Sequence, residues 1–300
     1  MEFDCAIIGG GPAGLNAALV LGRARRKTIL FDNHKPRNAI TRVSHGFLTR
    51  DGVSPSQFRE LAAEELTQYP SIQKEEREID SISQDGAGFR LVSLSGRALY
   101  ARKIILATGL IESLPKIDGL ANCYGTSIFN CPYCDGWELR DKPLVLLSET
   151  SQAYRMAMLL YNWSQDLIVC TNGQDVLTLK QQAALREKGL LVESQPVDFL
   201  LADKGRLAAV RFADGSMIRR NGGFVTPVLS QNRPFADILG CKRNENNDMI
   251  TDAFGRTSVR GVYAAGDTAT AAPSQLIIAA AAGSRAAIGV NEDLSEETFA

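Results

Sequence analysis

The sequence predicts an α/β protein in which helices cover parallel sheets and one structural plan is used twice. Strand and helix patterns alternate along both halves of the chain. Its 300 residues suit two domains at the usual ~150 residues each. The composition, 45% hydrophobic and 22% charged, is that of a globular protein. Because parallel strands need crossover connections, the alternation itself predicts sheets with helices on their faces.

The first half opens with a strand, a glycine turn and a helix. Residues 3–8 are apolar except for Asp4 and run directly into the GGGPAG sequence at 9–14, after which residues 15–21 are rich in Ala and Leu. A second apolar strand at 28–31 ends in Asp32, which follows the last glycine of the turn by 18 residues. This order predicts a βαβ unit.

A capped helix and a meander follow in the first half. The SPSQ sequence at 54–57 has the form of a capping box with proline at the first helical position, and apolar residues with helical spacing continue to 66. Between 79 and 109, glycine-containing turns interrupt runs of alternating residues, which predicts a β-meander ending in a strand at 103–107.

The second half repeats this order. Its predicted elements are a strand at 144–147, a helix at 154–161, a strand at 167–170, a helix at 176–188 and a meander ending near 226. Two proline-bearing stretches, 114–119 and 228–240, are the expected crossings between the halves. We therefore expect an inserted domain at 114–242 within a discontinuous domain formed by residues 1–113 and 243–300.

The net charge and the cysteine content indicate which binding partners and which cellular compartment to expect for this protein. Lys and Arg total 33 against 34 Asp and Glu, a net charge of −1, so electrostatics favours neither a nucleic-acid nor an anionic-membrane partner. No apolar run approaches the ~20 residues that span a bilayer, and no basic leader precedes the first strand. Six cysteines are too few for a disulfide-stapled scaffold. We expect a cytoplasmic protein without a membrane partner.

The glycine turn has the pattern of a dinucleotide site. Gly9 permits the tight turn, Gly11 lets backbone N–H groups approach a pyrophosphate, and Gly14 allows the helix to pack closely on the sheet. The helix N-terminus would hold the anion, and Asp32 lies at the offset of a carboxylate that binds a ribose hydroxyl. The alternative is a glycine-rich turn of purely structural use.

Two charged segments are read as structural. Arg23, Arg25, Arg26 and Lys27 follow the first helix, where cations complement the helix dipole, and we interpret them as a solvated helix end. The acidic segment 291–300 is expected to be a frayed tail, with an aromatic cap on a cofactor by Phe299 as the alternative.

The most specific segment is CPYCDGWE at 131–138. Pro132 suits a first helical position, which would place Cys131 at a helix N-terminus, where the dipole lowers a thiol pKa. A redox dithiol of Cys131 and Cys134 is the preferred interpretation. A zinc site is poorly supported because only His34 and His45 are available as further soft ligands, and a pair of inert core cysteines is the other alternative. Cys5 and Cys170 lie in predicted strands and are read as core residues.

Two later segments suggest which dinucleotide is bound. ATG at 107–109 closes one strand, and GVYAAGD at 261–267 closes another before a helix that begins near Gln275. With the opening glycines, they resemble the three-part FAD signature of the two-dinucleotide-binding flavoproteins. The resemblance implies that Asp267 contacts the ribityl or pyrophosphate part of FAD, and that Gln275 and Leu276 face the flavin N1–C2=O edge. The implied FAD-binding residues are Gly9, Gly11, Pro12, Ala13, Gly14, Asp32, Asn38, His45, Ala107, Thr108, Gly109, Gly266, Asp267, Gln275 and Leu276.

Together with the CxxCDG sequence, these segments resemble the low-molecular-weight thioredoxin reductases over nearly the whole chain. HGFL at 45–48, PRN at 36–38 and CPYCDGWE are closer to the branch that includes the gliotoxin and holomycin dithiol oxidases. The resemblance implies two Rossmann-like three-layer (ββα) dinucleotide-binding domains, the second inserted into the first, and a homodimer. It also implies that Cys134 faces the flavin, that Cys131 forms the mixed disulfide with substrate, and that Asp135 donates and accepts the proton. Asp after the second cysteine is the reductase pattern, whereas the oxidase branch often has His.

The second half lacks the features of an NADPH site. After the strand at 144–147 the chain reads SETSQA, without a glycine and with the carboxylate of Glu149 where a pyrophosphate would approach. After the strand at 167–170 it reads Thr171-Asn172-Gly173, which offers no guanidinium for a 2′-phosphate. We expect NADPH to bind weakly or not at all.

The sequence thus predicts an FAD-dependent dithiol–disulfide oxidoreductase. Its electrons would leave to oxygen, as in a dithiol oxidase, or arrive from ferredoxin or another donor, as in a reductase. The substrate would be a small-molecule dithiol or disulfide, or a thioredoxin-like protein. Two alternatives remain: an NADPH-dependent thioredoxin reductase, and a non-catalytic flavin-binding redox sensor.

Overall fold

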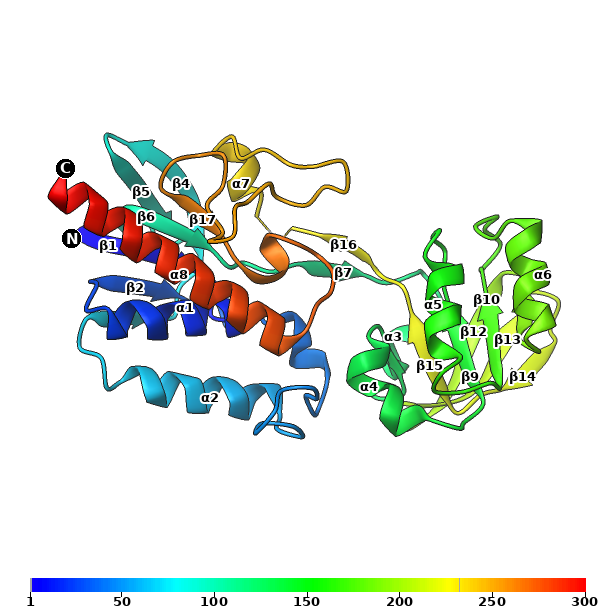
Figure 1. Ribbon diagram of the computed structural model, residues 1–300. Coiled ribbons are helices and arrows are strands. Elements are labelled where there is room, and N and C mark those ends of the chain that lie inside the picture. The colour runs from blue at the N-terminus through cyan, green and yellow to red at the C-terminus, as the bar shows by residue number, and fades with distance from the viewer. Residues whose placement is uncertain (1, 232) are drawn as a thin grey trace. The chain divides into compact units, whose positions relative to one another are not determined.

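The computed structural model describes residues 2–231 and 233–300 (Figure 1). Contacts divide the chain into two compact units. Unit 1 comprises Met1–Ala39, Gly46–Ile111 and Leu229–Ala300; unit 2 comprises Ile40–His45 and Glu112–Val228.

Two paired strands carry the chain between the units. Apart from the short segment Ile40–His45, which groups with unit 2, the chain leaves unit 1 within β7 (Ile111–Ser113) and returns within β16 (Val228–Ser230). The outward crossing lies close to the expected boundary after residue 113. The return lies earlier than the boundary expected after residue 242, because the segment that follows β16 packs with unit 1 through α7 (Phe235–Ile238).

Unit 1 is built on a mixed sheet. Its strands are β1 (Glu2–Ile8), β2 (Thr28–Phe31), β3 (Ile72–Glu75), β4 (Ile79–Asp85), β5 (Gly88–Ser93), β6 (Ala98–Leu106) and β17 (Val262–Ala264). The order is β3-β2-β1-β6-β5-β4, and β17 also pairs with β6. Pairs among β1, β2, β3, β6 and β17 are parallel, and the β4–β5–β6 meander is antiparallel. The βαβ opening and the meander are therefore confirmed.

Helices α1 (Pro12–Arg23) and α8 (Leu276–Phe299) lie side by side in unit 1 (Figure 1). A Cβ at Gly283 would overlap the Ala13 carbonyl oxygen, so glycine permits this close approach. Asn16 Nδ2 donates to the Ala280 carbonyl at 3.0 Å. Helix α2 (Pro55–Leu66) begins where the sequence predicts, since the Ser54 side chain accepts from the Gln57 N–H at 3.1 Å. The 3₁₀ turn η2 (Gly266–Thr268) also lies in unit 1, and the 3₁₀ turn η1 (Arg37–Ile40) ends at the first residue of unit 2.

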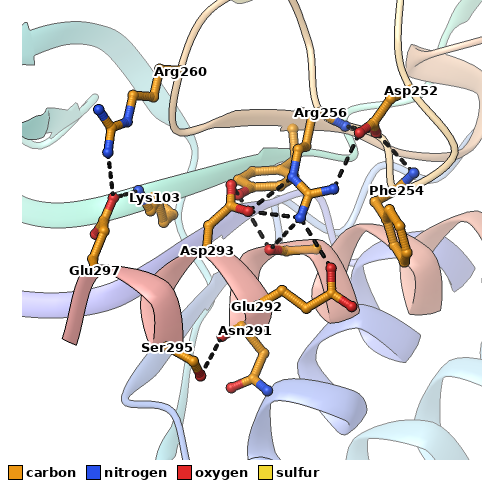
Figure 2. Close-up of polar contacts among 12 residues, drawn as sticks. Lys103, Asp252, Phe254, Arg256, Arg260, Asn291, Glu292, Asp293, Ser295 and Glu297 are labelled. Carbon is orange, nitrogen blue, oxygen red and sulfur yellow. Dashed lines mark hydrogen bonds and ion pairs between the residues drawn. The ribbon is translucent and has the colours of Figure 1, made fainter. Parts of the chain in front are cut away.

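The expectation of a frayed C-terminal tail is wrong, because α8 continues as a regular helix to Phe299. Figure 2 shows the contacts that hold its last turns. Arg256 Nη2 lies 2.7 Å from Asp293 Oδ1 and 3.1 Å from Glu292 Oε2, and the buried Lys103 pairs with Glu297 at 2.5 Å. The acidic residues of this segment thus face cations from distant parts of the chain. Phe299 itself is 92% exposed.

Unit 2 has a parallel sheet in the order β11-β10-β9-β15-β8 and an antiparallel sheet in the order β12-β13-β14. Its strands are β8 (Ile128–Phe129), β9 (Leu144–Leu147), β10 (Leu167–Cys170), β11 (Leu191–Glu193), β12 (Val197–Asp203), β13 (Arg206–Phe212), β14 (Met217–Arg219) and β15 (Gly222–Val225). Its helices are α3 (Leu120–Cys123), α4 (Pro132–Leu139), α5 (Ala153–Leu160) and α6 (Leu179–Glu187). Helix α6 begins three residues later than predicted, because Thr178 and Gln181 form a capping box.

Both units have three layers, as the predicted fold class requires. In unit 2, one apolar core joins the parallel sheet to β12–β14, and a second joins its other face to α5 and α6. In unit 1, one core lies toward the meander and the other beneath α1 and α8. Cys5 and Cys170 are fully buried in these cores, as expected. Among the described residues, no helix is long and apolar enough to span a bilayer.

Candidate active site

The glycine turn of unit 1 leaves a helix N-terminus open. Gly9 has a φ of 118°, which favours glycine, and a Cβ there would overlap the Ala107 carbonyl. A Cβ at Gly14 would overlap the Gly9 carbonyl, so this glycine brings α1 against the turn. Gly11 is the N-cap of α1, and the space where its Cβ would lie is open to 4 Å. Pro12 and Ala13 start the helix, whose described first turn holds no acidic residue.

Asp32 lies directly after β2 and is 5% exposed. Its Oδ1 accepts from the His34 N–H at 2.9 Å, and its Oδ2 accepts from Arg59 Nη2 at 2.7 Å. Burial opposes ionisation of this carboxyl, but these hydrogen bonds outweigh it and lower the pKa of Asp32. A Cβ at Gly10 would overlap the Asp32 side chain, so glycine at this position lets Asp32 lie against the turn. The carboxylate is held ionised next to the turn.

Asp267 lies in η2, beyond the end of β17, in the second half of the proposed FAD site. Its Oδ2 accepts from Arg37 Nη2 at 2.7 Å and from Ser274 Oγ at 2.9 Å. Gly266 in the same turn has a φ of 64°, and a Cβ there would lie 3.0 Å from the Ala13 Cβ. These contacts place η2 beside the start of α1.

The remaining predicted FAD residues surround the same region of unit 1, with one exception. Ala107, Thr108 and Gly109 follow β6, and the Gly109 N–H donates to Thr268 Oγ1 at 2.8 Å. Gln275 is the N-cap of α8 and Leu276 its first residue, and Asn38 lies in η1. His45 groups with unit 2 instead, where its Nε2 lies 3.7 Å from Glu138 Oε1.

The CPYC sequence forms the start of α4, as predicted. Cys131 is the N-cap, Pro132 is the first helical residue, and Cys131 and Cys134 are joined by a disulfide with 5.3 Å between their Cα atoms. A Cβ at Gly136 would lie 2.8 Å from the Trp163 indole, so this glycine lets α4 sit on that ring. Because the helix dipole favours negative charge at its N-terminus, reduction would leave Cys131 where a thiolate is stabilised.

Asp135 follows the second cysteine and lies in the first turn of α4. Burial raises the pKa of this carboxyl to about 7, the negative charge of Glu138 adds to the increase, and His45 opposes it. A group with such a pKa holds and releases a proton near neutral pH. It is therefore suited to proton transfer beside the disulfide.

Glu112 links the crossing strand to the residue that precedes the disulfide. Its carboxylate accepts hydrogen bonds from Asn130 Nδ2 and from the Tyr124 hydroxyl. Glu112 lies in β7, at the border of the two units. This contact between β7 and the start of α4 could not be read from the sequence.

The corresponding turn of unit 2, between β9 and α5, is closed by its own side chains. Ser148 and Thr226 share a buried hydrogen bond of 2.6 Å between their hydroxyl oxygens. Glu149 Oε1 accepts from Asn172 Nδ2 at 2.5 Å, and Asn172 Oδ1 accepts from the Val197 N–H at 2.7 Å. Polar side chains and a carboxylate therefore occupy the turn that glycines form in unit 1.

Sequence reasoning missed several residues of the unit 1 site. Arg59 holds Asp32, Arg37 holds Asp267, and Gly283 admits the start of α1. Only Gly283 had a local signal, a glycine within a run of alanines. The two arginines reach their partners from distant positions in the chain.

Comparison with known proteins identifies the family. The model of the pyridine nucleotide-disulphide oxidoreductase family matches residues 3–170 and 177–283. A crystal structure assigned as thioredoxin reductase TrxB of Bacillus anthracis has 43% identity and a TM-score of 0.95, covering 99% of this chain and 100% of that one. The crystal structure of HlmI has 35% identity and a TM-score of 0.95, covering 99% of this chain and 94% of that one.

A named relative gives the same result. Thioredoxin reductase sirT of Leptosphaeria maculans is 31% identical, and the alignment covers 96% of this chain and 93% of the relative. The fold agrees with these matches over almost the whole chain. The chain therefore belongs to the pyridine nucleotide-disulphide oxidoreductase family, as a thioredoxin reductase-like enzyme.

Proposed function

We propose that this enzyme is an FAD-dependent dithiol–disulfide oxidoreductase that uses the Cys131/Cys134 pair and is not fed by NADPH. The observation that carries the proposal is the contrast between the open glycine turn of unit 1 and the closed β9–α5 turn of unit 2. Only the first offers free helix N–H groups to a pyrophosphate.

The residues of unit 1 fit FAD. The open space at Gly11 and the N-terminus of α1 would hold the pyrophosphate, and Asp32 would accept from a ribose hydroxyl. Asp267 would bind the ribityl or pyrophosphate part, and the N-terminus of α8 at Gln275 would face the flavin. The other predicted residues of unit 1 complete the proposed site, whereas His45 groups with unit 2 and its contact with FAD stays a prediction. When bound, FAD would exchange an electron pair with the Cys131/Cys134 couple.

The protein's own residues carry the thiol chemistry. A substrate thiolate attacks Cys131 Sγ, the Cys131–Cys134 bond breaks, and a mixed disulfide with substrate forms. The second substrate thiol then attacks the substrate sulfur of that mixed disulfide, which releases the substrate disulfide and leaves both cysteines reduced. Asp135 takes up and returns a proton, which its pKa of about 7 allows.

The electron balance requires a second partner. Each oxidised substrate dithiol gives up two electrons and two protons, which reduce one molecule of oxygen to hydrogen peroxide in an oxidase. In the opposite direction, ferredoxin or another donor would supply the pair for reduction of a substrate disulfide. The proposed substrate is a small dithiol or a thioredoxin-like protein, and the working form is a homodimer.

Oxygen uptake with dithiothreitol tests this proposal. The wild-type enzyme should consume oxygen over many turnovers, whereas Cys134→Ser should retain FAD and lose multiple turnover. Cys241→Ser is the matched control, because Cys241 is buried and lies outside the pair. No uptake, combined with disulfide reduction by reduced ferredoxin, would assign the reductase direction. Unchanged turnover in Cys134→Ser would contradict the proposal.

The second candidate is an NADPH-dependent thioredoxin reductase, which the name of the relative sirT, a thioredoxin reductase, favours. It requires NADPH to bind unit 2 by a mode other than a glycine turn. Steady oxidation of NADPH in the presence of a disulfide would support this candidate.

A further inference from the structure

Unit 1 carries a pocket that the proposed chemistry does not use, at the C-terminal end of α1. Its volume is about 540 Å³, and its walls are formed by Gly22, Arg23, Arg25, Tyr69, Pro70 and Ser71. This volume falls within the ~300–1,000 Å³ of small-molecule sites.

The four cations at this helix end have different partners. Arg26 donates to Asn291 Oδ1 and to Ser295 Oγ, both at 2.7 Å, and so ties α1 to α8. The Lys27 ammonium lies 5.3 Å from the centroid of the Phe3 ring. Arg23 and Arg25 line the pocket, and neither forms an ion pair with a carboxylate in the part of the chain that the structure describes. Arg23, Arg25 and Lys27 are exposed, as expected for a solvated helix end, whereas Arg26 is half-buried and bonded to α8.

The backbone at Arg25 does not call for an arginine. Its φ is 62°, and the N–H groups of Arg25 and Arg26 donate to the carbonyls of Gly22 and Leu21. This pattern ends a helix with a left-handed residue, a position at which glycine is least strained. The arginine thus occupies a position that would suit glycine better, and its side chain contributes to the pocket wall.

The wall beside it is already ordered. Arg23 Nη1 donates to the Tyr69 hydroxyl at 3.2 Å. Tyr69 approaches α1 closely because residue 22 is glycine, since a Cβ there would lie 3.0 Å from the Tyr69 Cβ. One guanidinium is therefore held in place before any ligand arrives.

We propose that this pocket binds an organic phosphate. Two arginines without carboxylate partners among the lining residues match the charge and the several oxygens of a phosphate. Tyr69 and Pro70 offer surface to an organic group, and the pocket is far larger than a phosphate ion alone. This site is distinct from the FAD and dithiol residues and goes beyond the proposed oxidoreductase activity.

Titration calorimetry of the FAD-loaded enzyme with AMP tests the proposal, with adenosine and inorganic phosphate as separate probes. The test variant is Arg25→Gly, which keeps or raises the melting temperature because glycine suits a φ of 62°. The matched control is Lys204→Gly, which removes an exposed cation at a φ of 50° in unit 2. Oxidoreductase turnover should be the same in both variants and the wild type.

We expect the wild type and Lys204→Gly to bind AMP equally, and Arg25→Gly to bind it at least tenfold more weakly. Adenosine and inorganic phosphate should each bind the wild type at least tenfold more weakly than AMP. Absence of AMP binding to the wild type, equal binding by Arg25→Gly, or equal weakening in Lys204→Gly would overturn the proposal. Inorganic phosphate binding as tightly as AMP would also overturn it, because the organic part would then contribute nothing.

Discussion

The β1–α1 turn of unit 1 and the β9–α5 turn of unit 2 occupy equivalent places in two similar folds and differ in chemistry. In the first, three glycines leave the start of α1 open, and an ionised Asp32 lies at the end of the next strand. In the second, Ser148, Glu149 and neighbouring side chains hydrogen-bond to one another. The proposed function therefore assigns the nucleotide site to the turn that side chains and negative charge leave open.

The comparison also shows what unit 2 has instead. In unit 2, Cys131 is the N-cap of α4. The positive end of this helix dipole therefore lies at a sulfur atom rather than at a phosphate site. The family name refers to a pyridine nucleotide, but the local chemistry of unit 2 favours thiol exchange. Four substitutions test this contrast between the two units.

The largest effect, on FAD binding, is expected when a carboxylate like that of Glu149 is introduced into the glycine turn of unit 1. Gly11→Glu places a negative charge where the space in front of α1 is open, and the backbone φ of −79° accepts any residue. Repulsion of the pyrophosphate should weaken FAD binding on the order of 100-fold. The FAD-to-protein ratio after purification measures this, and Gly11→Ala is the control. Full FAD content in Gly11→Glu would refute the proposed role of the turn.

The next effect concerns the carboxyl beside the disulfide. Asp135→Asn should slow dithiol oxidation about 10²-fold and abolish the fall in rate below pH 7, because the proton acceptor is lost. The folded-state pKa, about 7, lies above the ordinary value of 3.8, so ionisation of Asp135 destabilises the fold as the pH rises through this interval. The variant should therefore melt higher than the wild type at pH 8 and equally at pH 3.

These readouts are independent of each other. A slowed variant with an unchanged pH profile would show that another group titrates. A melting temperature that does not rise at pH 8 would show that the Asp135 carboxyl is not held in an unfavourable environment.

How much could be predicted from the sequence depended on how local the signal was. The turn before α1 and the start of α4 were predicted correctly, because Gly14 packs against Gly9 within the same turn and Pro132 occupies the first position of α4. The Arg59–Asp32 pair joins residues that meet only after α2 packs on the sheet. The last turns of α8 looked like a frayed acidic tail because their partners, Arg256 and Lys103, come from remote segments.

A moderate effect, on the free energy of unfolding, is expected when Asp32 loses its ion pair with Arg59. Arg59→Gln leaves a buried carboxylate with a weaker partner, which should cost about 1–3 kcal/mol of stability at pH 7. Because the pKa of Asp32 is lowered in the fold, this contribution exists above the ordinary pKa and disappears as the pH falls through the folded value. The difference in unfolding free energy between variant and wild type, from denaturant titrations, should shrink toward pH 3. A difference independent of pH would exclude the ion pair as its cause.

The smallest effect is expected from removing the carboxylate of unit 2 alone. Glu149→Gln abolishes one repulsive charge but leaves the turn without glycines, so NADPH affinity should improve by at most about fivefold. Calorimetric titration with NADPH measures this change, with the wild type as reference. An improvement of two orders of magnitude would mean that charge, and not side-chain crowding, is what closes the turn.

Anaerobic reduction of the bound flavin tests the central claim most directly. In sealed cuvettes, one equivalent of NADPH or of dithiothreitol is added to the purified yellow enzyme while its visible spectrum is followed. We expect dithiothreitol to bleach the flavin through the Cys131/Cys134 pair and NADPH to leave the spectrum unchanged. Rapid stoichiometric bleaching by NADPH, or a flavin that the dithiol cannot bleach, would contradict this claim.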